Sequence, residues 1–359
     1  AMTATTLASL LDQKPVLLAD GATGTNFFDL GLGPGDPPEF WNLDAPEKVT
    51  ALHQAFVDAG SDIILTNTFG SNAPRLKLHK AQDRVFEYNE AGARLARAVA
   101  DETDRPVVGA GSVGPTGELF EPLGEMTYDD AVKAFVDQMQ GLKAGGADVA
   151  WIETMSAKEE MQAAADAANI CGLPYVVTAS FDTAGMTMMG LPPSEMPHLL
   201  DSMEPRPVAV GANCGVGASD LLMSVLSMSE QPGDMVIVAK ANCGIPQVRG
   251  DQVEYTGTPD LMADYIRLAV DAGARIIGGC CGTSPIHLAA MRQALDAHQK
   301  GERPDEAMIV GTIGPIINPV SSGVGKTETL SINPADFPSC VAPFPPVHRF
   351  PPSGGTAQR

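Results

Sequence analysis

The chain has 359 residues, of which 44% are apolar and 19% charged, and its formal net charge is −21. This composition suits a globular protein with a large core, and the acidic balance excludes nucleic acids and anionic lipid surfaces as partners, because both bind basic patches. The chain contains no apolar run long enough to predict a membrane span, and its N-terminal residues lack the pattern of a secretory signal.

Short β-branched runs alternate with longer amphipathic stretches along most of the chain. The runs are continuously apolar, which is typical of strands buried on both faces of a parallel sheet. Several amphipathic stretches end in Gly, the residue that most readily adopts the left-handed conformation closing a helix. The predicted strands are Val16–Asp20, Ile63–Asn67, Val107–Ser112, Val149–Glu153, Tyr175–Ser180, Val208–Asn213, Met235–Ala239 and Ile276–Cys280. The predicted helices include Pro46–Gly60, Asp83–Glu102, Thr127–Gly145, Ala157–Asn169, Ala218–Ser229, Pro259–Gly273 and Pro285–His298.

Eight strand–helix units predict an α/β fold of the (β/α)8 TIM-barrel type over residues 1–305. The competing fold is a doubly wound open sheet. That fold would need a Gly-rich phosphate-binding turn after the first strand, and DGATGT at residues 20–25 matches such a turn poorly.

Residues 306–359 are rich in Pro, Gly and Ser and show no helical period, so we expect a C-terminal arm or a partly disordered tail. GVGKTET at residues 323–329 lacks the upstream Gly and the strand of a phosphate-binding loop. Five apolar residues favour an arm that packs on the barrel: Ile313, Ile316, Ile317, Phe337 and Phe344.

Polar residues gather at the ends of the predicted strands. A TIM barrel carries its chemistry at the C-terminal ends of its strands, so these side chains should converge on one rim. They are Asp20, Asn67, Gly114, Glu153, Asn213, Cys214, Asn242, Cys280 and Cys281.

Three cysteines in this set form a candidate metal site. Cys280 and Cys281 are adjacent and flanked by glycines, and Cys214 ends a strand that lies two positions away around the barrel. Three thiolates leave the fourth tetrahedral position of Zn²⁺ open, which is typical of catalytic rather than structural zinc. The alternative is that these thiols are small buried core residues.

The six cysteines, without a secretory signal, indicate a reducing compartment, so we expect a cytoplasmic protein. Cys243 follows the predicted strand between the ligand strands; it is a neighbour of the site, a substitute ligand or a redox group. Cys171 and Cys340 lack a comparable setting and are assigned to the core and the tail. The histidines show no metal-binding spacing.

The motifs DGATGT, TNTFGSN, GSVGPTG, IET, GANCG, KANCGIP and GGCCGTSP, in this order over residues 15–300, resemble the homocysteine S-methyltransferase family. Within the family, GSVGPTGELFEPLG and NCGIP are most similar to the homocysteine-binding module of cobalamin-dependent methionine synthases. The chain is also similar to betaine–homocysteine S-methyltransferases.

The resemblance implies a zinc-dependent methyltransferase that methylates the thiolate of L-homocysteine to give methionine. It implies Zn²⁺ as the cofactor, with the homocysteine sulfur as fourth ligand. The residues implied are Cys214, Cys280 and Cys281 as metal ligands, Asp20 and Glu153 around the amino acid, and Gly21, Ala22 and Asn213 beside them.

The methyl donor is left open. Betaine-using relatives carry aromatic side chains where this chain has Gly70 and Thr154, and Phe40, Trp41 and Phe69 could replace them only in part. The donor is therefore either a small onium compound or a methyl-corrinoid protein acting in trans. Methylation of another thiol, a non-catalytic homocysteine- and zinc-binding subunit, and self-association also remain open.

Overall fold

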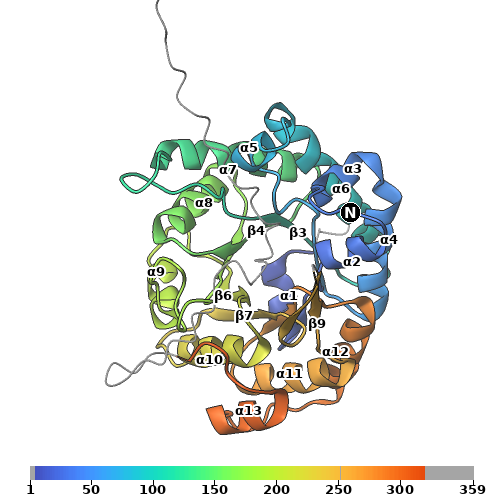
Figure 1. The fold of residues 1–359 in the computed structure, drawn as a ribbon, viewed down its shortest axis with the longest axis vertical. Helices are drawn as coiled ribbons and strands as arrows, with labels where there is room; N and C mark the ends of the chain where they lie inside the picture. Colours follow the sequence, from blue (N-terminus) through green and yellow to red (C-terminus); the bar gives the residue numbers. More distant parts are fainter. Residues whose placement is uncertain (1–4, 251, 320–359) are drawn as a thin grey trace, which may run out of the picture.

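Eight parallel strands form the centre of the computed structural model, which describes residues 5–250 and 252–319 (Figure 1). They follow the order β1-β10-β7-β6-β5-β4-β3-β2, and a bridge between Ala19 and Ile63 closes the ring. The predicted (β/α)8 barrel is confirmed, and each predicted strand is present with bounds that differ by a few residues. The strands are β1 Leu17–Leu18, β2 Ile63–Leu65, β3 Val108–Val113, β4 Val149–Met155, β5 Tyr175–Ala179, β6 Ala209–Cys214, β7 Val236–Ala241 and β10 Ile276–Gly279.

Helices surround the strands and follow one another around the ring in chain order (Figure 1). Most connect one strand to the next, so that their apolar faces cover the outside of the barrel. They are α1 Leu7–Gln13, α2 Gly24–Asp29, α3 Trp41–Asp44, α4 Pro46–Ala59, α5 Ala73–Lys77, α6 Val85–Glu102, α7 Tyr128–Ala144, α8 Lys158–Ile170, α9 Met196–Asp201, α10 Ala218–Ser229, α11 Pro259–Asp271, α12 Pro285–Ala297 and α13 Glu306–Ile313. Short 3-10 turns lie at Pro38–Phe40, Gln82–Arg84 and Pro193–Glu195.

The interior of the barrel is apolar at the N-terminal ends of the strands. Ile63, Trp151 and Val238 belong to one buried cluster there, together with Leu7 and Leu10 of α1. Helix α1 therefore closes this end of the barrel. Two residues further along β4 and β7, Glu153 follows Trp151 and Lys240 follows Val238, so on these strands the interior changes from an apolar floor to a polar layer toward the opposite end.

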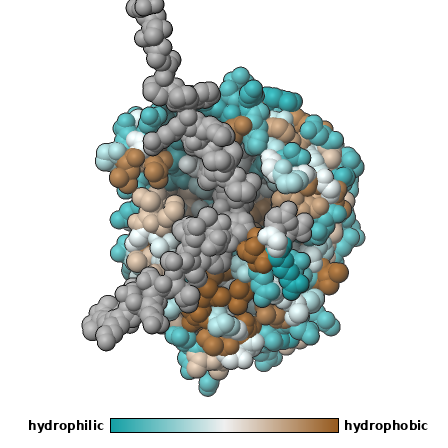
Figure 2. Space-filling model, viewed as in Figure 1, coloured by the Kyte–Doolittle hydropathy of each residue, from teal (hydrophilic) through white to brown (hydrophobic). Residues whose placement is uncertain are grey.

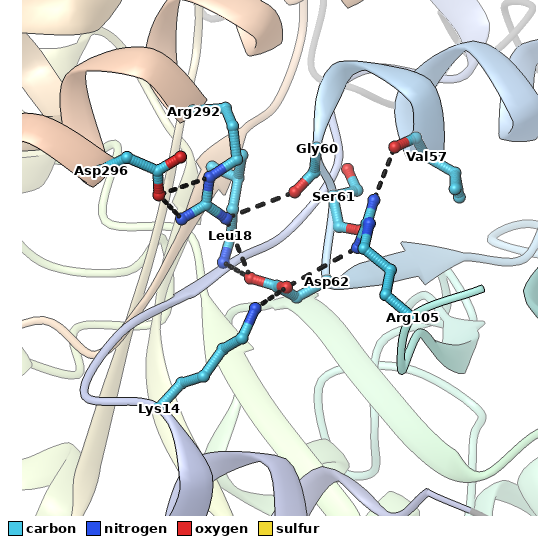
Figure 3. A network of polar contacts seen from close by, with 9 residues as sticks. All are labelled: Lys14, Leu18, Val57, Gly60, Ser61, Asp62, Arg105, Arg292 and Asp296. Carbon is cyan, nitrogen blue, oxygen red and sulfur yellow. Dashed lines mark hydrogen bonds and ion pairs between the residues drawn. The ribbon is translucent and has the colours of Figure 1, made fainter. Parts of the chain in front are cut away.

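A buried carboxylate reinforces the contact between the first two strands (Figure 3). Asp62 is almost fully buried and accepts hydrogen bonds from the backbone N–H of Leu18 at 2.9 Å and from Lys14 Nζ at 2.8 Å. Arg292 of α12 donates to the same carboxylate at 3.2 Å. Since three partners from separate segments meet at one charge, this network ties β1, β2 and α12 together at the closure of the barrel.

Several elements were not among those predicted from the sequence: the short helices α1, α2, α3, α5 and α9, a hairpin and helix α13. A hairpin of β8 Pro246–Arg249 and β9 Gln252–Tyr255 follows β7. Helix α13 follows α12 and packs against α10 and α11, with Ile309 fully buried. The expectation of no helix after residue 305 is therefore wrong for residues 306–313.

The described part of the C-terminal segment continues along the barrel after α13. The Gly314 carbonyl accepts a hydrogen bond from Ser219 at 2.7 Å, and Asp220 accepts one from the Asn318 N–H at 2.8 Å. Cys340, Phe337 and Phe344 lie outside the described residues, so the division at residue 305 stays a prediction. Within the described ranges, no helix combines the length and the apolar character that a bilayer crossing requires.

Candidate metal centre

Three cysteine sulfurs meet at the C-terminal end of the barrel. Cys214 is the last residue of β6, and Cys280 and Cys281 directly follow β10; β7 lies between these two strands. The three Sγ atoms all lie within 4.8 Å of one another. In the part of the chain that the structure describes, no other three residues of the types His, Cys, Asp and Glu gather in this way. The barrel thus brings Cys214 close to Cys280, which lies 66 positions later in the chain, as the sequence predicted.

The backbone around the cysteines is held by several contacts. Cys214 lies in the left-handed region, with φ of 56°, a conformation that costs a non-glycine residue about 1–3 kcal/mol. The N–H of Cys280 donates to the Ala241 carbonyl at 2.6 Å, and the N–H of Cys281 donates to the Asn242 side chain at 3.1 Å. The strand between the ligand strands, with the loop after it, therefore fixes where the sulfurs point.

The Cys280 thiol must lose its proton before it can bind a cation. Burial, together with the charge of Glu153, raises the pKa of the Cys280 thiol to about 11. Such a thiol keeps its proton at neutral pH unless a metal ion displaces it, and thiolates are the form that binds zinc. Cys214 and Cys281 are paired as a disulfide in this structure. A disulfide uses two sulfurs, whereas a metal ion uses all three, so the donor set fits Zn²⁺ once the protein is reduced.

Glu153 lies in the polar layer beside the cysteines. Its side chain is buried, and its carboxylate accepts a hydrogen bond from the Ser112 hydroxyl at 2.6 Å. Burial raises the pKa of Glu153, while the nearby Lys240 ammonium and the Ser112 hydrogen bond oppose this increase. A carboxylate in this position gains stability when a second cation approaches it, because the burial that disfavours its charge is then compensated.

Asp20 forms an ion pair that was not predicted. Its Oδ1 atom lies 2.8 Å from Lys240 Nζ, and its Oδ2 atom accepts the N–H of Leu65 at 2.9 Å. Lys240 lies two residues after Val238 on β7. Since residues two apart on a strand point to the same side of the sheet, the Lys240 side chain points into the barrel, as that of Val238 does. The signal that could have revealed it is the Lys inside the buried run VIVAKA, since an unpaired Lys is almost never buried.

Gly21 and Ala22 lie against the loop that carries the cysteine pair. The Ala22 N–H donates to the Thr283 carbonyl at 3.0 Å. A Cβ at Gly21 would lie 2.5 Å from that same carbonyl oxygen, so only glycine allows the two loops to approach this closely. The first loop of the barrel is therefore placed beside the metal-binding loop.

The remaining described cysteines do not join the cluster. Cys243 is fully buried and its thiol contacts the Gly257 carbonyl at 3.2 Å. Its N–H donates to the Cys281 carbonyl at 2.8 Å, so it supports the metal-binding loop through its backbone. Cys171 directly follows α8, on the outside of the barrel, and its thiol contacts the Val136 carbonyl of α7 at 3.8 Å.

The β8–β9 hairpin supplies one aromatic residue to this end of the barrel. A Cβ at Gly282, which has φ of 81°, would lie 2.4 Å from the Tyr255 Cβ, so Tyr255 packs directly on the loop after the cysteine pair. Burial and the charge of Cys280 raise the pKa of Tyr255 to about 12. Tyr255 was missed because the hairpin that carries it was missed.

Comparison with known proteins identifies relatives of the whole barrel. A family described as homocysteine S-methyltransferase matches residues 17–295. Methionine synthase of Mycobacterium tuberculosis (strain ATCC 25618 / H37Rv) is 30% identical over 316 residues, which are 83% of this chain and 26% of that protein. Methionine synthase of Mycobacterium leprae (strain TN) is also 30% identical, over 84% of this chain and 26% of its own length. The chain thus spans about a quarter of the length of these relatives.

Solved structures support the fold. The homocysteine methyltransferase MmuM from Escherichia coli, in its metallated form, superposes with a TM-score of 0.67 at 22% identity, covering 79% of this chain and 98% of that one. Its oxidized form superposes with the same TM-score at 23% identity, covering 80% and 98%.

Proposed function

The chain belongs to the homocysteine S-methyltransferase family, and we propose that it transfers a methyl group to the sulfur of L-homocysteine, giving methionine, at a zinc ion held by Cys214, Cys280 and Cys281. The observation that carries this proposal is the convergence of three cysteine sulfurs within 4.8 Å of one another at the mouth of the barrel. When bound, zinc would supply the positive charge that keeps a thiol substrate deprotonated at neutral pH.

The protein side chains position the amino acid. Glu153 is the carboxylate that receives the substrate ammonium, because it is buried beside the cysteines and its hydrogen bond from Ser112 leaves acceptor capacity. Asp20 acts through Lys240, to which it is already bound, and the backbone at Gly21 and Ala22 forms the adjacent wall. A buried site of this kind promotes methyl transfer by orienting the two reactants rather than by moving a proton.

The aromatic residues near the mouth argue against a small onium donor. Lys48 Nζ lies 4.6 Å from the centre of the Trp41 ring, and the Arg75 guanidinium lies 5.7 Å from that of Phe69. Phe40 stacks on Tyr88 at 5.0 Å. Since two of the three rings already face a protein cation and the third packs on another ring, these rings are poorly placed to form a cage for a quaternary ammonium group.

The surface around the mouth favours a donor carried by a protein. Large apolar side chains are exposed in segments that follow barrel strands, including Phe28 (52%), Leu123 (72%), Met188 (66%) and Val248 (60%). Figure 2 shows apolar patches on this face, one of them at the upper left over the loop that leads into α7. Exposed apolar surface of this kind is typical of protein interaction sites, so we propose a methyl-corrinoid protein as the donor, acting in the cytoplasm.

A donor panel tests the proposal. Reduced, zinc-loaded protein is incubated with L-homocysteine and, in separate reactions, methylcobalamin, betaine or S-methylmethionine, and methionine is measured by mass spectrometry. We expect methionine from methylcobalamin alone. Methionine from betaine or S-methylmethionine would contradict the proposal that a methyl-corrinoid protein is the donor. If homocysteine binds but none of the three donors gives methionine, the protein is better explained as a non-catalytic binding subunit.

A further inference from the structure

A buried ion pair lies in the polar layer directly below the three cysteines. Lys240 and Asp20 have side-chain exposures of 3% and 2%, and their charged atoms are 2.8 Å apart. In the strand register Lys240 is level with Asn213 on one side and Gly278 on the other, one residue before the level of Cys214. Its ammonium is therefore a fixed positive charge inside the mouth of the barrel.

The ammonium has hydrogen-bonding capacity to spare. A lysine ammonium has three N–H groups, and among the described residues Asp20 is the acceptor within hydrogen-bond distance of it. Both oxygens of Asp20 have a partner within the protein, because its second oxygen accepts the Leu65 N–H. The Ala22 N–H, in the loop that follows Asp20, is already bound to the Thr283 carbonyl.

The Lys240 side chain is positively charged and can bind the carboxylate of a free amino acid. Burial opposes the charge of Lys240, but the carboxylates of Asp20 and Glu153 outweigh burial and raise its pKa. A buried ion pair adds little stability compared with apolar residues of similar size, so stability does not account for the lysine. A free amino acid has a carboxylate as well as an ammonium, and Glu153 can receive only the ammonium.

We propose that Lys240 determines the specificity of the site for thiols that carry an α-carboxylate: its ammonium, held by Asp20, receives the carboxylate of homocysteine while Glu153 receives the amino group. This inference rests on the proposed function and names the side chain that selects its substrate. Lys240 is a binding residue and takes no part in breaking or forming the bonds to the methyl group.

The test compares two thiols that differ in one group. Reduced, zinc-loaded protein is titrated calorimetrically with L-homocysteine and with homocysteamine, which lacks the carboxylate. We expect the wild-type chain to bind homocysteine more tightly, by about 10- to 100-fold, the range of one charge-assisted hydrogen bond. Lys240→Met should remove this preference, because it lowers the affinity for homocysteine and leaves the affinity for homocysteamine as it is. The zinc content should not change. An equal loss for both thiols, or unchanged homocysteine affinity, would overturn the inference.

A double variant shows whether Lys240 binds the substrate carboxylate or only neutralises the charge of Asp20. Lys240→Met together with Asp20→Asn removes both members of the ion pair, so Asp20 is not left as a buried charge without its partner and the fold should tolerate the change better than the single variant. We expect it to lack the preference for homocysteine as well. If the double variant binds homocysteine as the wild-type chain does, Lys240 only neutralises Asp20 and the inference is wrong.

These titrations need no methyl donor, so they separate this inference from the proposed function. Carboxylate-dependent binding without any methionine formation would contradict the methyltransferase activity and leave the role of Lys240 standing. Wild-type protein that binds neither thiol would overturn both.

Discussion

The side chain of Asn213 is bound to both the backbone and the hydroxyl group of Thr154. Its oxygen accepts the Thr154 N–H at 2.9 Å, and its Nδ2 atom donates to the Thr154 hydroxyl at 2.8 Å. Thr154 and Cys214, the residue after Asn213, both lie in the left-handed region, with φ of 61° and 56°. Asn213 also hydrogen-bonds to the Cys280 thiol. One amide thus connects the residue after Glu153 with two of the proposed metal ligands.

Replacing Asn213 should therefore weaken metal binding without removing a ligand. Asn213→Ala is expected to reduce zinc affinity by about 10- to 100-fold, the range found when partners of metal ligands are removed. Competition with a chromophoric chelator measures this affinity. Thr178→Val is the matched control, because it removes only the hydrogen bond from Thr178 to Asn213. Equal affinity of Asn213→Ala and wild-type protein would show that the amide does not support the site.

The cysteines should differ sharply in their effect on zinc content. Cys281→Ala is expected to lose bound zinc and keep its far-ultraviolet circular dichroism, because its side chain lies at the mouth rather than in the core. Cys243→Ala is the control: it lies in the same region but outside the sulfur cluster, so zinc should stay bound. Mass spectrometric metal analysis of both variants checks this. Full zinc occupancy in Cys281→Ala would exclude Cys281 as a ligand.

Glu153 should recognise the amino group of the substrate. Glu153→Gln is expected to raise the dissociation constant of homocysteine about 10- to 100-fold, because an ion pair with the ammonium is lost. The affinity for mercaptobutyrate, which lacks the amino group, should not change. Ser112→Ala, which removes one hydrogen bond to the carboxylate, should have a smaller effect of about fivefold. Equal losses for both thiols would mean that Glu153 shapes the site without contacting the amino group.

Glu160 should make the stability of the protein depend on pH. It is buried in the first turn of α8, where it accepts a hydrogen bond from Thr116 at 2.9 Å, and burial raises its pKa from 4.5 to about 7. The unfolded chain therefore loses this proton at lower pH than the folded chain. The free energy of unfolding should fall as pH rises from 4.5 to 7, by up to about 3 kcal/mol.

Glu160→Gln should abolish that fall, so the variant matches the wild-type protein near pH 4 and exceeds its stability near pH 8. Urea unfolding at a series of pH values measures the difference. The exposed neighbour Glu159 offers the control, since Glu159→Gln should leave the pH dependence as it is. Parallel curves for wild type and Glu160→Gln would contradict a buried, protonated Glu160.

The barrel and the cysteine cluster were predictable because they follow from local patterns and one rule of topology. Continuously apolar runs identified the strands, and the rule that barrel strands end on one rim brought Cys214 to Cys280 and Cys281. The same rule placed Glu153 and Asp20 on this rim, whereas their use in substrate binding was implied by the resemblance and stays a prediction.

The ion pair, the hairpin and α13 could not be predicted in the same way. Lys240 and Asp20 are 220 positions apart, so nothing local in the sequence pairs them. The strands of the β8–β9 hairpin have four residues each and contain charged residues, so their alternation is too short to stand out from a loop. Helix α13 has eight residues in a Gly-containing segment, and its packing on α10 and α11 stabilises it more than its own sequence does.

X-ray absorption at the zinc edge tests the central claim most directly, because it counts the sulfur atoms bound to the metal. Reduced, zinc-loaded protein should show three sulfurs at about 2.3 Å and one lighter ligand, and addition of L-homocysteine should raise the count to four sulfurs. A count below three before addition, or no gain in sulfur on adding homocysteine, would contradict a zinc ion held by Cys214, Cys280 and Cys281 that binds the substrate thiol.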